Sequence, residues 1–228
     1  GPPDMTKRMI VPLIFGLVGA AILLSLGSWQ LRRLEWKEGV LAEIEARISD
    51  TPAALPAAPD PEADRYMPVR ATGRFTGEQV RVLSSVKQVG PGHRLIAAFQ
   101  TGGRRVLVDR GFLPLQSGSE ALPQGEVTLT GNLHWPDEVD GFTPDPEPDN
   151  NLWFARDVPA LAAHMGTEPV LIVARQVSGE GGAVAPLPVD TSGIPNDHLG
   201  YAVTWFGLAI VWLGMTALLL WRIRRKTV

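Results

Sequence analysis

Two long uncharged runs lie near the two ends of the chain, and the sequence between them mixes polar and apolar residues. From Tyr201 to Trp221 no residue is charged, and a run of this length can cross the ~30 Å hydrocarbon core of a bilayer as a helix. Tyr201, Trp205 and Trp221 place amphipathic rings near the ends of this run, where such rings favour the membrane interface. We therefore predict a transmembrane helix over residues 198–221.

The other uncharged run covers residues 10–26, and we predict a transmembrane helix over residues 9–30. A cleaved signal peptide is the alternative, because the Gly-Ala-Ala sequence at residues 19–21 is small enough for a signal peptidase. The apolar run continues past this site to Trp29, which is longer than a typical signal core. This length favours an uncleaved anchor.

The residues after the first run keep a helical pattern. Apolar positions from Leu31 to Ile48 recur at helical spacing rather than in alternation. We predict that the first span continues out of the bilayer as one helix to about residue 48. The proline-rich stretch at residues 49–61 then ends it.

The middle of the chain has the pattern of strands separated by turns. Runs rich in β-branched and aromatic residues cover residues 67–75, 79–86, 95–101 and 104–115, and residues 126–134 alternate in polarity. Gly102 and Gly103 separate two of these runs and predict a tight hairpin. Connections this short cannot hold crossover helices, so we predict a mostly antiparallel sheet. A barrel or a strongly curled sheet would protect its edges.

The end of the middle region combines a short helix with a final strand. Asp157 is placed to cap a helix over residues 158–164, and residues 169–177 are apolar enough for a buried strand. We assign residues 62–178 to a β-rich domain and residues 179–197 to a linker. The predicted fold class is an α+β membrane protein, with two transmembrane helices flanking a mostly antiparallel, barrel-like domain that carries a short helix.

The charges predict how the chain is oriented. Lys7 and Arg8 precede the first run, and residues 222–226 carry four basic groups after the second run. Between them lie 15 basic and 23 acidic residues, a net charge of −8. Because basic flanks stay on the cytoplasmic side, we expect both termini in the cytoplasm and the β-rich domain outside. An acidic domain is also a poor partner for nucleic acid.

Several kinds of chemistry have no support in the sequence. The chain has no cysteine, which excludes disulfides, thiolate metal sites and thioether attachment of haem. The common hydrolase, metalloprotease and nucleotide-binding motifs are absent, and the four histidines do not have metal-ligand spacing. Arg110 stands between apolar strand residues, and we interpret it as a partly buried, paired arginine with a structural role.

His198 lies at the start of the second predicted span. Tyr201 and Trp205 follow it by three and seven residues, so the three side chains share one helix face. An imidazole above two aromatic rings at the water–lipid boundary is suited to a haem. A helix-capping or interface histidine above an aromatic belt is the alternative, and the spacing alone leaves both open.

Five motifs occur in an order that is typical of one protein family. They are GSWQLRRLEWK, GRFTGEQV, VDRGFLP, NNLWFARDVPALAAHMG and HLGYAVTWFGLA. With these motifs the chain resembles the surfeit-locus-protein-one family of cytochrome c oxidase assembly factors, over residues 8–226. The family architecture, two spans flanking a domain outside the inner membrane, agrees with the charge argument.

The resemblance implies a function and a site. A bacterial member would lie in the inner (plasma) membrane with its domain in the periplasm, bind haem a transiently and hand it to oxidase subunit I. His198 matches the position that such members use for the haem iron, and Tyr201, Trp205 and Trp29 would pack against the porphyrin. The implied partners are subunit I, haem a synthase and membrane lipids.

Two other functions remain as alternatives. In the first, the protein is a scaffold that stabilises an assembly intermediate of subunit I without carrying haem. In the second, it is a membrane-anchored enzyme, although no nucleophile–base set is visible in the sequence. A haem spectrum of the purified protein would separate the first alternative from the haem carrier.

Overall fold

The computed structural model describes residues 3–226, which fall into two compact units. One unit combines the chain up to Glu43 with the chain from Ser192 onward, and it holds two long helices. The other unit, Ile44–Thr191, holds the sheet and a short helix. Each unit has its own internal packing.

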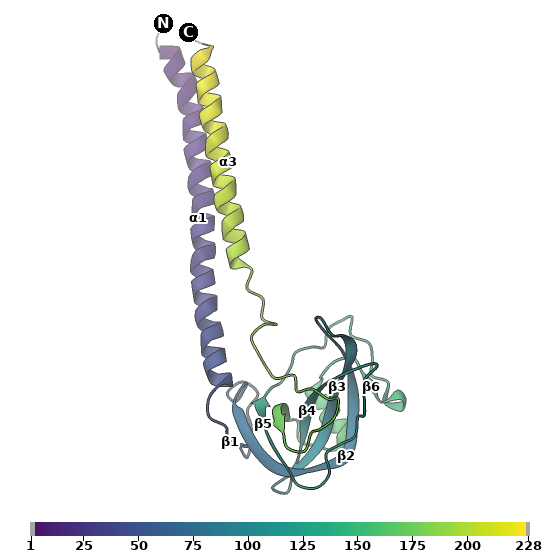
Figure 1. Cartoon of the computed structure of the whole chain (residues 1–228). Coiled ribbons are helices and arrows are strands. Elements are labelled where there is room, and N and C mark those ends of the chain that lie inside the picture. The colour runs from purple at the N-terminus through teal and green to yellow at the C-terminus, as the bar shows by residue number, and fades with distance from the viewer. Residues whose placement is uncertain (1–2, 227–228) are drawn as a thin grey trace. The chain divides into compact units, whose positions relative to one another are not determined.

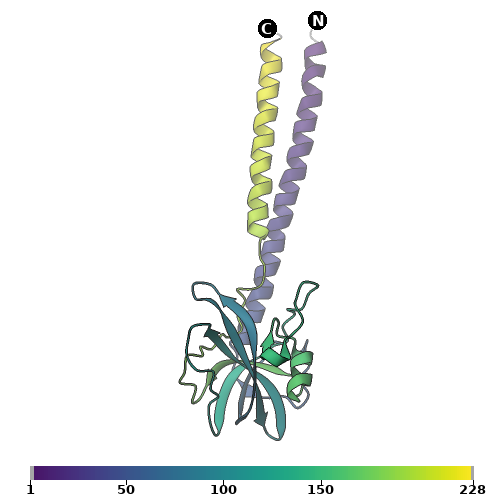
Figure 2. The same cartoon turned by 90° about the vertical axis from the view of Figure 1, so that its right-hand side faces the viewer.

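The helical unit pairs the two ends of the chain. Helix α1 covers Pro3–Ile48, with its last residues in the sheet unit, and helix α3 covers His198–Arg225. The two helices run side by side in opposite directions, so the N- and C-terminal ends lie at the same end of the pair (Figures 1 and 2). Both helices are long and apolar enough to cross a membrane, judged by length and composition.

Glycines on α1 let the two helices approach closely. An added Cβ at Gly16 would lie 2.3 Å from a side-chain carbon of Thr216, and one at Gly19 would lie 2.4 Å from the Trp212 ring. The indole Nε1 of Trp212 donates a hydrogen bond to the carbonyl oxygen of Gly16 at 2.9 Å. Small residues at helix contacts and polar links between helices are typical of packing in lipid. Gly207 on α3 has open space around it and takes no part in this contact.

The sheet unit is built from strands that close on themselves. The strands are β1 (Ala53–Ala54), β2 (Pro68–Val86), β3 (Gly90–Thr101), β4 (Arg104–Pro114), β5 (Val127–Leu133), β6 (Leu152–Trp153) and β7 (Leu171–Val177). A 3₁₀ turn, η1, covers Pro148–Asn150. The first half of β2 pairs with β5, and its second half pairs with β3. Strand β3 then pairs with β4, β4 with β7, and β7 with β5, so the five strands form a closed ring.

The sheet is mixed, so the prediction of a mostly antiparallel sheet is wrong. Strand β7 runs parallel to β4, and the short strands β1 and β6 run parallel to β2. Short connections require antiparallel pairing only between strands that follow one another closely in the chain. Strand β7 comes after β5, a long loop and a helix, and this length of chain allows it to return beside β4 in the parallel direction.

Turn chemistry follows the sequence closely. Gly102 and Gly103 have φ of 56° and 76° and join β3 to β4 as an antiparallel hairpin, which confirms the predicted turn. The two strands predicted at residues 67–75 and 79–86 form the single strand β2. A bulge between Phe75 and Gln79 interrupts its register, so one strand bends enough to serve two neighbours.

Two large hydrophobic clusters and one small cluster form the core of the sheet unit. Alternate residues of β7 enter different clusters: Ile172 packs with Phe99 and Leu129, whereas Val173 packs with Leu161 of helix α2. Helix α2 covers Val158–Met165, as predicted from its capping residues. The Asp157 carboxylate accepts a hydrogen bond from the Ala160 amide at 3.2 Å, and Gly166 ends the helix with φ of 62°.

The VDRGF segment of β4 contributes two buried charges. The Arg110 side chain is fully buried and forms an ion pair with Glu180, so the predicted pairing is confirmed. The neighbouring Asp109 carboxylate, also fully buried, accepts hydrogen bonds from Arg94 at 2.7 Å and from Arg156 at 3.1 Å. Both charges are therefore compensated, as burial of a charge requires.

Candidate cofactor site at the start of helix α3

His198 is the first residue of α3, and its side chain contacts α1. Its ring nitrogen Nδ1 lies 2.9 Å from the side-chain oxygen Oε1 of Gln30. Gln30 is almost completely buried, with 9% of its surface exposed. This hydrogen bond therefore links the N-terminal residue of α3 to a fixed position on α1.

The hydrogen bond determines which tautomer of His198 is present. An amide oxygen only accepts hydrogen bonds, so Nδ1 carries the proton and donates it to Gln30. In a neutral imidazole the lone pair then lies on Nε2. Metal-bound histidines have this arrangement, with one ring nitrogen on the metal and the other donating to an oxygen acceptor. His198 would therefore hold a haem iron through Nε2, with Gln30 supporting the ring through Nδ1.

The three aromatic side chains predicted for the site differ in how exposed they are. Trp29 and Tyr201 expose 46% and 57% of their surfaces, and Trp205 is half-buried. The Trp29 ring has the Arg33 guanidinium 6.0 Å from its centroid. Within residues 3–226, these three rings make no ring–ring contact with one another. They are apolar surface beside the helix pair rather than a closed aromatic box.

Gln30 is the site residue that sequence reasoning missed. It stands in the GSWQLRR motif, directly after Trp29, at the end of a long apolar run. A neutral amide at this place is a polar group that needs a partner once the helix packs. Its position in the first span gives no indication that the partner lies at the start of the second.

The other histidines lie in the sheet unit and have different surroundings. Burial, followed by the charge of Arg156, lowers the pKa of His134 to about 4. The His134 ring stacks on Tyr66 at 5.4 Å, and His164 lies 5.4 Å from the Trp153 ring. Among the described residues no three His, Asp or Glu side chains come close enough together to hold a metal ion.

Fold and site define a class of protein. The chain has two apolar helices at its ends, a closed mixed sheet between them, and a tautomer-fixed histidine where one apolar helix begins. The model of the SURF1 family matches residues 17–210. The chain therefore belongs to the SURF1 family, the cytochrome oxidase assembly factors that its motifs resemble.

Relatives from several animals support this membership. Surfeit locus protein 1 of Homo sapiens is 31% identical over 206 residues, which cover 79% of this chain and 68% of the relative. Surfeit locus protein 1 of Xenopus tropicalis is 32% identical, covering 80% of this chain and 67% of the relative. A SURF1-like protein of Drosophila melanogaster is 32% identical, covering 88% and 75%.

Proposed function

We propose that the protein is a cytochrome c oxidase assembly factor that binds haem a at the periplasmic boundary of the inner membrane and assists its insertion into oxidase subunit I. One observation carries the haem part of this proposal: the hydrogen bond from His198 Nδ1 to Gln30 leaves Nε2 free to bind iron. Membership of the SURF1 family supports the assembly role.

We propose that both long helices, α1 and α3, lie in the membrane. Their outer faces expose large apolar side chains, such as Val11 at 70% and Ile210 at 72%, which suits a hydrocarbon environment. The start of α1 and the end of α3 lie at the same end of the helix pair (Figure 1), and the last turn of α3 carries Arg222, Arg224 and Arg225. Both termini would then be cytoplasmic, with the sheet unit in the periplasm of a bacterial inner membrane.

Each site residue has a separate task in this proposal. Haem a is the group to be transferred, and its apolar porphyrin is poorly soluble in water. His198 offers one nitrogen to the iron, while Gln30 holds the imidazole in the correct tautomer. Trp29, Tyr201 and Trp205 offer exposed or half-exposed apolar surface for packing. One bond from His198 to the iron and an open aromatic surface suit a site that must later release the haem.

A spectrum of the full chain purified from haem a-producing cells tests the proposal. We expect bound haem in the wild type, and loss or a shift of its spectrum in His198→Ala with the protein still folded and membrane-bound. His93→Ala, His134→Ala and His164→Ala are the matched controls and should keep the wild-type spectrum. Haem binding that survives in His198→Ala but disappears in one of the controls would place the site in the sheet unit and refute the boundary site.

A second candidate function, a scaffold for an assembly intermediate of subunit I, is favoured by one separate observation. Phe142 is 95% exposed on an acidic turn. The Asp140 carboxylate holds the backbone of this turn by accepting from the Phe142 amide at 2.8 Å, and the ring extends into solvent. Phe142→Ala should then lower recovery of subunit I with the protein while leaving the haem spectrum unchanged. The haem-carrier proposal predicts that His198→Ala changes the spectrum and Phe142→Ala does not.

A further inference from the structure

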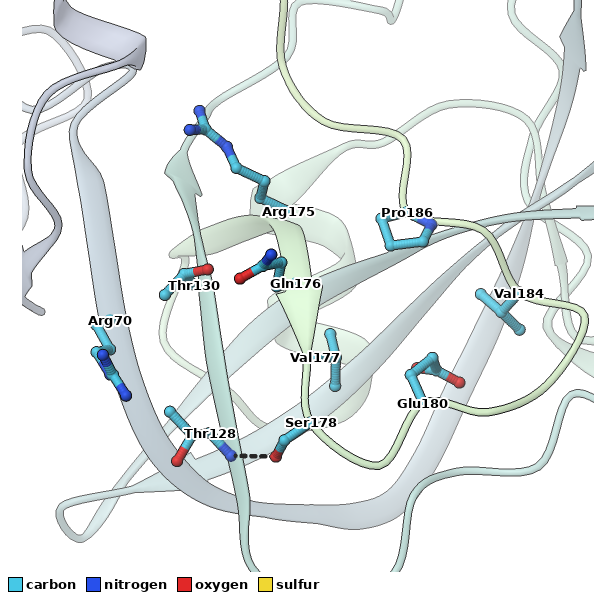
Figure 3. Close-up of a pocket in the computed structure, with 10 residues that line it drawn as sticks. All are labelled: Arg70, Thr128, Thr130, Arg175, Gln176, Val177, Ser178, Glu180, Val184 and Pro186. Carbon is cyan, nitrogen blue, oxygen red and sulfur yellow. Dashed lines mark hydrogen bonds between the residues drawn. The ribbon is translucent and has the colours of Figure 1, made fainter.

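A hollow of about 560 Å³ lies on the sheet unit (Figure 3). Three neighbouring strands supply one side of it: Arg70 from β2, Thr130 from β5, and Arg175 with Gln176 from β7. Val184 and Pro186, from the segment that follows β7, supply the other side. The hollow thus has a cationic, hydrogen-bonding side and an apolar side.

The segment that follows β7 is fixed to the sheet. Phe112 and Ala185 exchange two backbone hydrogen bonds, of 2.8 and 3.0 Å. Gly111 has φ of 125°, and an added Cβ there would lie 2.0 Å from the Ala185 carbonyl oxygen, so glycine is needed for this approach. The hollow is therefore preformed, and a ligand would not have to order this wall.

Among the described residues, Glu180 is the one acid that lines the hollow, and its charge is already neutralised. Both oxygens of Glu180 accept hydrogen bonds from Arg110, at 3.0 Å from Nε and 2.5 Å from Nη2. Glu180 therefore cannot compensate the charge of the arginines that face the hollow.

Those two arginines have no acidic partner among the described residues. The Arg70 side chain is exposed and makes no hydrogen bond or ion pair with the side chains that the structure describes, those of residues 8–226. Arg175 donates only to neutral oxygens, the Ile48 carbonyl at 2.9 Å and Asn132 Oδ1 at 3.0 Å, and only through Nη2. Two arginines thus line one hollow in a region of the sequence whose net charge is −8.

At this part of the sheet a ligand would meet side chains and not unpaired backbone. Strand β5 pairs with β2 on one edge and with β7 on the other, so no open strand edge is available for backbone pairing. The Thr130 hydroxyl and the Gln176 amide make no side-chain hydrogen bonds within the described part of the chain. They add uncharged donors beside the two guanidinium groups.

We propose that this hollow binds the carboxylates of an acidic peptide segment of a partner protein. A guanidinium matches the planar carboxylate with two parallel hydrogen bonds. The apolar side, formed by Val177, Val184 and Pro186, suits the aliphatic part of Asp and Glu side chains. The volume is larger than one small anion needs. This site does not depend on haem binding and stands apart from the proposed function.

Fluorescence anisotropy of a labelled hexaglutamate peptide, titrated with the full chain in detergent at constant ionic strength, tests the proposal. Loss of a charge-assisted hydrogen bond should weaken binding about 10-fold or more. We expect this loss in Arg70→Gln and Arg175→Gln. Arg74→Gln is the matched control, because Arg74 is exposed on the same strand and its side chain makes no hydrogen bond or ion pair with the described residues. Its binding should therefore stay within about 2-fold of the wild type.

Two further measurements make the outcome decisive. Labelled hexaglutamine should not bind, because it lacks carboxylates. Inorganic phosphate at the peptide's concentration should not displace hexaglutamate; displacement would show a site for small oxyanions and overturn the peptide proposal. Equal affinity of Arg70→Gln and Arg74→Gln would overturn it as well. Arg70 has no side-chain hydrogen bond or ion pair among the described residues, so its variant remains informative even if Arg175→Gln fails to fold.

Discussion

Arg110 holds Glu180, 70 residues further along the chain, through two hydrogen bonds of 3.0 and 2.5 Å. The same guanidinium donates to Gln79 Oε1 and to the carbonyl oxygens of Glu120 and Ala121. One buried side chain thus connects strand β4, strand β2 and two segments that lie outside the sheet. This arrangement makes Arg110 a structural residue of the sheet unit.

Arg110→Ala should strongly destabilise the sheet unit. It leaves Glu180 as a buried carboxylate without its partner, and breaking a buried pair costs roughly 3–5 kcal/mol. Arg74→Ala, which removes an exposed arginine, should cost under about 0.5 kcal/mol. Denaturant unfolding of the full chain in detergent compares the two free energies of unfolding. Equal midpoints for Arg110→Ala and wild type would contradict the buried network.

Gln30→Leu should weaken haem binding without removing the iron ligand. The leucine has a similar size but cannot accept the proton of His198 Nδ1, and loss of such a supporting group typically costs about 10- to 100-fold in metal affinity. Haem titration followed by absorbance measures the change. Gln116→Leu, at an exposed position in the sheet unit, is the control. Unchanged affinity in Gln30→Leu would mean that the hydrogen bond does not support the ligand.

Gly19→Leu should destabilise the contact between α1 and α3. Even the first carbon of the new side chain would overlap the Trp212 ring, and overpacking of a close contact costs typically about 1–3 kcal/mol. Gly207→Leu is the matched control, because nothing lies within 4 Å of an added Cβ there. Thermal loss of helical circular dichroism in detergent compares the variants. A lower midpoint for Gly207→Leu than for Gly19→Leu would contradict the helix contact described above.

His134 should make the sheet unit less stable in mild acid. Burial lowers its pKa from 6.5 to about 4, and its Nδ1 is buried without a hydrogen-bond partner among the described residues. Between these two values the unfolded chain binds more protons than the folded chain. The stability contribution is therefore present above pH 6.5 and is lost as the pH falls toward 4.

The matching variant is His134→Phe, which cannot titrate. On lowering the pH from about 7 to about 5, the wild type should lose roughly 1–2 kcal/mol more of its free energy of unfolding than the variant. Denaturant unfolding at the two pH values gives both losses. If the two proteins lose the same amount, His134 is not the group that responds to acid in this range.

The sequence by itself determined the local elements. Apolar runs near the two ends of the chain predicted the apolar helices, because periodicity and length are properties of neighbouring residues. Capping by Asp157 and the turn at Gly102 and Gly103 were predicted for the same reason. The buried pairing of Arg110 was also inferred, because a charge within an apolar strand needs a partner, although its partner, Glu180, was not.

Only the tertiary structure decided how distant segments meet. Strand β7 lies parallel to β4 because the chain returns after a long loop and a helix, which no local pattern records. The partner of His198 is Gln30, 168 residues away, and Arg70 shares a hollow with Arg175 across three strands. Such contacts depend on which faces pack against each other. Each such contact is formed by two residues that are far apart in the sequence, so the local pattern around one of them does not predict the other.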